Sequence, residues 1–299
     1  MNTNLSEQQK YDPWELQQEV ANFKITVHCC RYWMLSEWEC ENMSFPFWRL
    51  YHSRLGGAYA SLEGKTVHLS PDKIIIIPPY TSFSTHLKGS SGNESIKGVR
   101  IKEEAEILFY QKQGMTDQMF VHFNLGYPYD QIKQDVYEIS VDHITENIVR
   151  EIENDRLEEP NTIGFQSNLK IVTLILFALQ RFSPALWNIP ETDNRILKAI
   201  RYIDKNLDKQ LTNEELSTMA NLAVNSFARL FRECMNNSVQ QYIQQRRIDQ
   251  AIILLHHSDL SIEEISSQCG FYDRHHFSRI FRKQTGFPPG SYRQRMRAN

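Results

Sequence analysis

The sequence predicts an α+β protein of two domains. The N-terminal domain is expected to be a β-barrel with a pair of helices, and the C-terminal domain to be all-α with two helix-turn-helix units. Three observations support this fold class. Short β-branched runs between turn residues fill residues 23–124, apolar residues recur at helical spacing after Ile132, and residues 195–299 contain an internal repeat. A chain of 299 residues is long enough to bury a core in each domain.

The N-terminal strands are expected to form a small barrel or sandwich. The run Ile74-Ile75-Ile76-Ile77 is closed by Pro78-Pro79. Four β-branched residues in succession suit a strand that is buried on both faces. Glycine and proline pairs such as Gly56-Gly57 are typical of the turns between such strands.

Two helices are expected after these strands. An amphipathic helix is predicted to begin at Ile132, because apolar residues recur at steps of three to five, namely Ile132, Val136, Ile139, Ile144, Ile148 and Ile152. A second helix, residues 166–182, is apolar around much of its circumference, so it packs either within the chain or against a partner chain. Residues 183–194 include Pro184 and Pro190 and form the expected linker. The predicted domains are therefore residues 1–182 and 195–299.

The C-terminal region repeats itself at an interval of fifty residues. Phe227-Ala-Arg-Leu-Phe231-Arg232 returns as Phe277-Ser-Arg-Ile-Phe281-Arg282. Upstream of these runs, Thr212-x-x-Glu215 and Ser261-x-x-Glu264 both match a capping box, which marks a helix start. Each first helix is predicted to end at a residue that tolerates a positive φ, which is Asn221 in one unit and Gly270 in the other.

The second helix of each unit is predicted to expose a polar and cationic face. Its apolar residues fall on one side at i, i+3 and i+4, and the opposite side carries Asn225, Arg229 and Arg232 or, in the second unit, His275, Arg279 and Arg282. Such side chains can meet base edges and phosphates in a major groove. A solvated helix face is the alternative for any single arginine, but two units in register favour DNA binding. The charge balance agrees, because residues 191–299 hold 16 Lys and Arg against 12 Asp and Glu, whereas the rest hold 17 against 24.

At this point the sequence resembles the AraC/XylS family of bacterial transcription regulators. The resemblance covers about residues 195–297 and is strongest in the second unit, from Ile262 through Gly270-Phe271 to Gly286-Phe-Pro-Pro289 and Tyr292. By position, it implies that the base-facing residues are Asn225, Ala228 and Arg229 in the first unit and Arg274, His275, His276 and Arg279 in the second. The first unit departs from the family pattern at Ala223 and Asn236, where a capping Ser and a Gly are usual.

The family resemblance also implies an architecture and a mode of action. It extends weakly to the N-terminal region, which is similar to the cupin-like sensor barrel of arabinose-responsive members. It implies that a small-molecule effector, such as a carbohydrate, binds this barrel, that the helices within residues 132–182 form a homodimer, and that the protein activates transcription by contacting double-stranded DNA and RNA polymerase. An aromatic-rich barrel with a few polar groups can bind such an effector, although most of these aromatic residues are expected to be core residues of the barrel. The expected ligand-binding residues are Arg31, Trp48, Arg49 and Tyr51.

The alternative function is that of a cupin-type enzyme carrying a DNA-binding tail. Metal-dependent cupins use an HxH pair, and none occurs in this sequence, where His52, His68 and His86 are isolated. Adjacent histidines such as His256-His257 point to different sides of a helix, which is unsuitable for chelation by the pair. No phosphate-binding or nucleophile-elbow motif occurs either. We therefore expect no catalytic residues, no cofactor and no metal.

The cysteines and the N-terminus suggest a cytoplasmic location. The five cysteines are odd in number and form no CxxC pair, which suits free thiols in a reducing compartment. The start of the chain lacks the pattern of a signal peptide, and the most apolar stretch, residues 171–179, is too short to span a bilayer.

Overall fold

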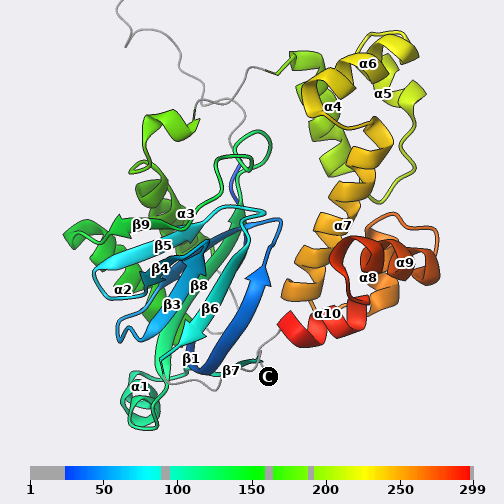
Figure 1. Cartoon of the computed structure of the whole chain (residues 1–299). Helices are drawn as coiled ribbons and strands as arrows, with labels where there is room; N and C mark the ends of the chain where they lie inside the picture. The colour runs from blue at the N-terminus through cyan, green and yellow to red at the C-terminus, as the bar shows by residue number, and fades with distance from the viewer. Residues whose placement is uncertain (1–23, 89–94, 159–163, 188–191, 297–299) are drawn as a thin grey trace, which may run out of the picture.

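The computed structural model describes residues 24–88, 95–158, 164–187 and 192–296, and it confirms the predicted fold class. A nearly closed antiparallel β-barrel forms the N-terminal part, and a group of helices forms the C-terminal part beside it (Figure 1). None of the described helices is long and apolar enough to cross a membrane.

The barrel is a sheet of nine strands among the residues described, and every strand pair in it is antiparallel. The strand order is β4-β3-β6-β1-β8-β2-β5-β9, and β7 pairs with the long β1. The strands are β1 (Thr26–Met43), β2 (Trp48–His52), β3 (Ala58–Leu62), β4 (Lys65–His68), β5 (Lys73–Ile77), β6 (Phe83–Leu87), β7 (Ser95–Arg100), β8 (Thr116–Asn124) and β9 (Tyr137–Ser140).

Strand β5 is buried on both faces, as its four isoleucines predict. Ile75 and Ile77 belong to the apolar cluster inside the barrel, whereas Ile74 and Ile76 pack on the outer face of the sheet. Two helices cover that outer face, α2 (His143–Glu158) and α3 (Phe165–Leu179). The short helix α1 (Glu104–Gln111) connects β7 to β8 and was not predicted, because the region as a whole reads as strands.

The prediction that a helix begins at Ile132 is wrong. The helix begins at His143, and Val136 and Ile139 instead lie at or in strand β9, which pairs with β5. Exposed Glu138 and Ser140 flank the buried Ile139, so this short segment has the alternation of a strand. Spacings of four and three residues fit a helix equally well over so few residues, and pairing with the edge of β5 decides the outcome. The second predicted helix is confirmed as α3.

The region predicted as a linker contains a short 3-10 helix, η2 (Pro184–Trp187). The Trp187 ring stacks on Phe182 and lies parallel to Trp48, so this segment packs against the barrel. Residues 188–191 of the predicted linker lie outside the described residues. The C-terminal helices follow as α4 (Asn194–Lys205), α5 (Asn213–Met219), α6 (Val224–Met235), α7 (Val239–His257), α8 (Ile262–Gln268), α9 (Arg274–Thr285) and α10 (Pro289–Met296).

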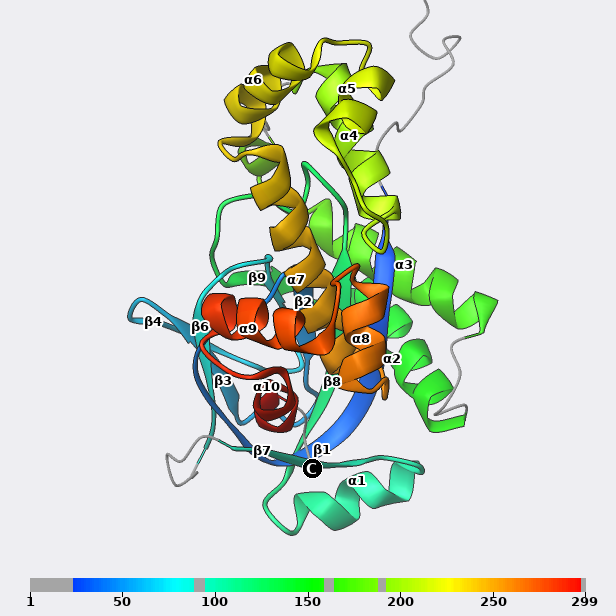
Figure 2. The ribbon, with the colours of Figure 1, turned by 90° about the vertical axis from the view of Figure 1, so that its right-hand side faces the viewer.

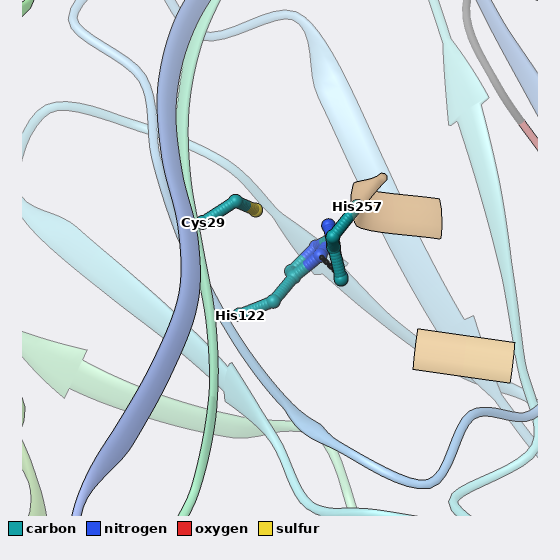
Figure 3. A group of neighbouring side chains, drawn as sticks. All are labelled: Cys29, His122 and His257. Atoms are coloured by element: carbon teal, nitrogen blue, oxygen red, sulfur yellow. Dashed lines mark hydrogen bonds between the residues drawn. The ribbon is translucent and has the colours of Figure 1, made fainter. Parts of the chain in front are cut away.

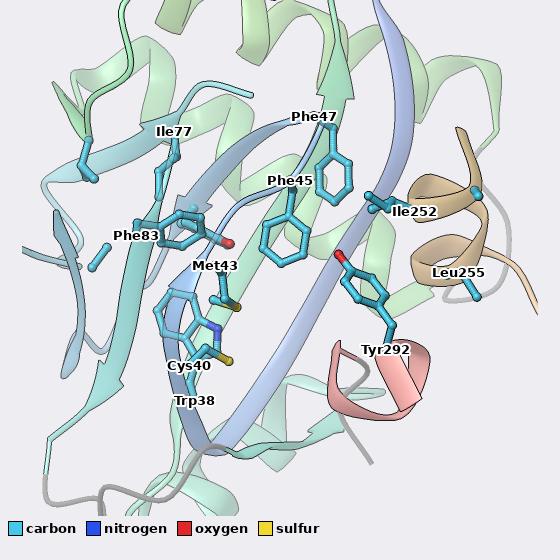
Figure 4. Close-up of a cluster of buried hydrophobic side chains, with 14 of the residues drawn as sticks. Trp38, Cys40, Met43, Phe45, Phe47, Ile77, Phe83, Ile252, Leu255 and Tyr292 are labelled. Atoms are coloured by element: carbon cyan, nitrogen blue, oxygen red, sulfur yellow. The ribbon is translucent and has the colours of Figure 1, made fainter. Parts of the chain in front are cut away.

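The C-terminal helices form two cores, and the second one merges with the barrel. Phe227 and Phe231 are fully buried in a core between α4, α5, α6 and the start of α7. Phe277 and Phe281 hold the equivalent places in the second unit, as the repeat predicts. That second core is continuous with apolar residues of the barrel (Figure 4), where Tyr292 of α10 and Ile252 of α7 face the barrel's aromatic side chains.

Candidate functional site

Both first helices begin at the predicted hydroxyl caps, but only the second unit forms a complete capping box. The Ser261 hydroxyl accepts from the Glu264 amide, and the Glu264 carboxylate accepts from the Ser261 amide. In the first unit, the Thr212 hydroxyl accepts from the Glu215 amide at 3.1 Å. The Glu215 carboxylate instead accepts a hydrogen bond from the Tyr202 hydroxyl at 2.6 Å. A tertiary partner on α4 thus replaces the local one.

The turn of the second unit requires glycine at position 270. Gly270 has a φ of +71°, and a Cβ atom there would lie 2.1 Å from the carbonyl oxygen of Leu207. Its counterpart Asn221 also adopts a positive φ, of 54°. The turn therefore joins the second unit closely to the segment that follows α4.

The predicted DNA-contacting residues lie on the second helices of the two units. Most of these side chains are exposed, namely those of Asn225, Arg229, Arg232, Arg274, His275, Arg279 and Arg282, and those of Ala228 and His276 are half-buried. Arg229 lies 3.8 Å from Glu233, one helical turn away, and both are well exposed. The Asp273 carboxylate caps α9 by accepting from the His276 amide, whereas Ala223 gives α6 no side-chain cap. The absence of a side-chain cap is expected from the sequence, because alanine has no side-chain acceptor.

Helix α7 separates the two units. The units lie at opposite ends of it, with α5 and α6 at one end and α8 and α9 at the other (Figures 1 and 2). Its 19 residues correspond to about 28 Å of helix. Successive major grooves on one side of DNA are about 34–36 Å apart. A rigid α7 therefore spaces the units on the scale of one turn of the double helix.

Sequence reasoning missed Tyr272, which precedes the capping residue of α9. Its side chain is 94% exposed, the most of any large hydrophobic residue described. Only its position in the turn of the second unit, beside the predicted DNA-contacting residues of α9, could have singled it out.

A second candidate site is a cavity between the barrel and the C-terminal helices. Its volume is about 80 Å³, which is room for a few water molecules. Of the four predicted ligand-binding residues, Arg31, Arg49 and Tyr51 line it. Trp48 does not. It is buried on the other side of the sheet, where its Nε1 donates to Asp130 at 2.8 Å.

Arg49 and Arg31 make this cavity electropositive. Arg49 Nη1 donates to the Tyr51 hydroxyl at 2.8 Å, and its guanidinium carbon lies 3.5 Å from the centre of the Phe45 ring. The described lining residues include no carboxylate. The other lining side chains are mostly apolar or aromatic, among them Trp33, Trp38, Phe120 and Met296.

Two histidines and a cysteine meet at one end of this cavity (Figure 3). The ring nitrogens His122 Nδ1 and His257 Nε2 are 3.3 Å apart, and Cys29 lies beside them. Burial lowers the pKa of both imidazoles, and neighbouring cationic groups including Arg49 lower it further, so both rings are neutral. Burial raises the pKa of the Cys29 thiol to about 11. Sequence reasoning missed this group because its members come from three distant segments.

Polar contacts also join the domains. The Tyr80 hydroxyl, after β5, donates to Asp249 of α7 at 2.7 Å. Arg246 of the same helix binds Asp204 and Asp249. The Tyr127 and Thr192 hydroxyls are 2.9 Å apart. Tyr80 thus fixes α7 to the barrel at Asp249, and Tyr127 holds the segment before α4.

Comparisons with known proteins agree with the geometry of the two units. Residues 216–295 match the model of a helix-turn-helix domain family. The C-terminal region therefore contains a helix-turn-helix domain. The chain is 26% identical over 149 residues to the HTH-type transcriptional activator RhaS of Citrobacter koseri, covering 49% of this chain and 52% of that protein. It is 32% identical over 114 residues to the activator RhaR of Cronobacter sakazakii, covering 38% and 40%. The chain therefore spans about half the length of the curated relatives it matches.

A solved structure of similar length shares the two-domain fold. The helix-turn-helix domain and the barrel together align with apo ToxT from Vibrio cholerae at a TM-score of 0.50 and 11% identity. The alignment covers 94% of this chain and 100% of that one. At this identity, the match concerns the fold alone.

Proposed function

We propose that the protein is a sequence-specific DNA-binding transcription regulator whose effector acts at the junction of its two domains. The observation that carries this proposal is the pair of helix-turn-helix units at opposite ends of α7, each with an exposed polar second helix. Two such units on one rigid helix suit recognition of two successive major grooves. The names of the matched relatives, which are transcriptional activators, support activation as the outcome.

The interdomain cavity is the best candidate for effector binding. Arg31 and Arg49 supply donors for an oxygen-bearing molecule such as a carbohydrate, and the aromatic lining supplies an apolar surface. A molecule larger than a few waters has to widen the cavity, which displaces α7 from the barrel. Effector binding would then change the placement of both DNA-binding units. Because the effector would bind the widened arrangement more tightly than the closed one, it could shift the protein between the two.

A homodimer through α3 is the second part of the proposal. Phe165, Leu169 and Leu176 of this helix are exposed, and their spacing places them along one side of it. An exposed apolar stripe of this kind marks a protein interface, and a second copy of α3 would cover it. As a regulator, the protein would act in the cytoplasm, and the family resemblance adds RNA polymerase as a further partner.

The experiment that tests the regulator is selection of bound fragments from random and genomic DNA by the full-length protein, repeated over a range of salt. Enrichment of one site across the salt series supports sequence-specific binding. Binding without preference that weakens steeply with salt shows phosphate contact alone. Turnover of a small molecule by the protein would favour the alternative of an enzyme with a DNA-binding tail.

A further inference from the structure

Cys29, His122 and His257 converge because of strand register and the end of a helix. Cys29 of β1 and His122 of β8 are directly opposite each other in the antiparallel pair, so their side chains project from the same face of the sheet. His257 is the last residue of α7, where that helix meets the barrel. One ligand atom from each residue lies within 4.8 Å of the other two (Figure 3).

The spacing of the two imidazoles suits a common metal ion. A zinc ion bonds histidine nitrogen at about 2.0–2.1 Å in a tetrahedral arrangement, which separates two ligand nitrogens by about 3.3–3.4 Å. The facing nitrogens of His122 and His257 are 3.3 Å apart. Zinc–sulfur bonds of about 2.3 Å would require the Cys29 sulfur to lie about 3.5 Å from each nitrogen. The Cys29 sulfur lies within 4.8 Å of both nitrogens, so metal binding would have to draw it closer by about 1 Å at most.

The two facing ring nitrogens can each offer a lone pair to a cation, because a neutral imidazole has one unprotonated ring nitrogen. The facing nitrogens share one N–H proton between them, and both outward nitrogens, His122 Nε2 and His257 Nδ1, are buried without a hydrogen-bond partner. When a cation binds between the facing nitrogens, the ring that carries this proton would change tautomer, and the proton would move to its outward nitrogen. The lone pairs of both facing nitrogens would then bind the metal.

The charges around the group set its selectivity. Arg31 and Arg49 line the adjacent cavity and repel any cation. A thiolate offsets one positive charge, and its soft sulfur selects thiophilic ions over Mg²⁺ and Ca²⁺. His28, which stacks on His257, bonds Asn124 through its Nε2 at 2.7 Å and keeps that contact. The cavity leaves a position for a water molecule as fourth ligand.

We propose that Cys29, His122 and His257 bind one thiophilic divalent cation, of which Zn²⁺ is the best fit, at the junction of the two domains. Binding releases the thiol proton of Cys29 to solvent and forms one metal–sulfur and two metal–nitrogen bonds. Because two ligands belong to the barrel and one to α7, the cation ties the DNA-binding domain to the barrel. The site stands by itself, whereas its regulatory role rests on the proposed function.

Metal uptake by the full-length protein tests the site without DNA. After treatment with a chelator, the protein is titrated with Co²⁺ and then with Zn²⁺. We expect one ion per chain, a sulfur-to-cobalt charge-transfer band, and displacement of Co²⁺ by Zn²⁺. Cys29→Ser should abolish the band, and His122→Gln or His257→Gln should weaken affinity at least about tenfold, since even outer-sphere changes cost that much.

Matched variants separate ligand loss from damage to the fold. Cys30→Ser alters the neighbouring buried cysteine, which packs with the cluster on the other side of the sheet, and His68→Gln alters a distant histidine of β4. Both should keep the band and the affinity. The circular dichroism and melting temperature of each variant are compared without metal. Absence of a stoichiometric ion, or equal uptake by Cys29→Ser and Cys30→Ser, overturns the site.

The regulatory role has a separate readout. The affinity for a selected DNA site is measured with and without Zn²⁺ for the native chain and His257→Gln. We expect Zn²⁺ to change the affinity of the native chain at least about fivefold, the lower end of usual allosteric coupling, and to leave that of His257→Gln unchanged. Metal uptake with unchanged DNA affinity overturns the regulatory role alone. Metal uptake with no specific DNA binding overturns the proposed function and leaves the cation site standing.

Discussion

The Tyr80 hydroxyl donates a hydrogen bond of 2.7 Å to the Asp249 carboxylate, and this bond joins the barrel to the helix that lies between the two helix-turn-helix units. Asp249 is buried, and Gln245 and Arg246 of the same helix also bind it. Tyr80 is therefore the barrel's contribution to a network whose other members belong to α7 and, through Asp204, to α4.

Removing that hydroxyl should loosen the docking of α7. Tyr80→Phe leaves Asp249 with its two partners on α7, and the Tyr80 side chain is 36% exposed. We therefore expect the free energy of unfolding to fall by about 1 kcal/mol, near the mean contribution of a hydrogen bond. Urea unfolding and the rate of limited proteolysis measure the effect. Tyr59→Phe, within the barrel, is the control and should change neither the free energy of unfolding nor the cleavage rate. An unchanged cleavage rate in Tyr80→Phe would show that this bond does not fix the domains.

Arg279 is expected to contact base edges. Arg279→Ala should weaken binding to the selected DNA site by about 1–3 kcal/mol and relax preference at one or two base pairs. Arg150→Ala on α2 removes the same charge far from α9 and should have no effect on preference. Competition among variant sites measures the outcome. Uniform weakening across all sequences would assign Arg279 to phosphate contact instead.

Gly270 and Gly286 separate backbone strain from steric clash. Both have a positive φ, but a Cβ at Gly270 meets the Leu207 carbonyl oxygen, whereas a Cβ at Gly286 meets nothing within 4 Å. We expect Gly286→Ala to lower the free energy of unfolding by about 1 kcal/mol and Gly270→Ala by at least about 3 kcal/mol. Urea denaturation of the two variants provides the comparison. Equal losses would mean that the turn can move away from Leu207.

The buried histidines predict a loss of stability in acid. Burial lowers the pKa of His122 and His257, and His28, His256, Arg31 and Arg49 surround them. Below a pH of about 6.5, an unfolded histidine binds a proton that the folded one excludes. The free energy of unfolding should therefore fall as the pH drops from 7.5 to 5.5, by up to about 1.4 kcal/mol per pH unit for each histidine.

Urea unfolding at the two pH values, in the presence of a chelator, measures this loss. His257→Gln should reduce the difference between pH 7.5 and 5.5, and His143→Gln, which alters an exposed histidine, should not. The same difference in both variants would place the acid sensitivity elsewhere in the chain.

The α3 stripe predicts the oligomeric state. Replacing both Leu169 and Leu176 by Lys should convert a dimer to a monomer. The substitutions remove apolar contacts from the interface and place lysine charges opposite the same charges of the second chain. Sedimentation of the variant and the native chain distinguishes the two states. A native chain that is already monomeric at micromolar concentration would contradict the proposed interface.

Local chemistry explains which features the sequence predicts. The Ser261–Glu264 box and the Gly270 turn depend on residues within one turn of each other, so their pattern is visible in the chain. The box at Thr212 is incomplete because Tyr202, on another helix, binds Glu215. A tertiary partner also explains why no helix begins at Ile132. The edge of β5 pairs with this segment as a strand, and the local spacing of apolar residues does not reveal that pairing.

The interdomain group lies beyond any local pattern. Cys29 and His122 meet through strand register, and His257 joins them only because α7 docks on the barrel. The placement of Arg31, Arg49 and Tyr51 around one cavity likewise depends on the barrel's closure. Trp48 faces the opposite side of the sheet from its neighbour Arg49, as alternation along a strand requires.

The most direct test of the central claim changes the spacing of the DNA rather than the protein. The affinity of the full-length protein is measured for its selected site and for versions with about five base pairs, half a helical turn, inserted between the two half-elements. Because α7 fixes the separation of α6 and α9, we predict that the insertion lowers affinity to that of a single half-element, and that Arg229→Ala then has no further effect. Equal affinity for both spacings would contradict recognition of two successive grooves by one chain.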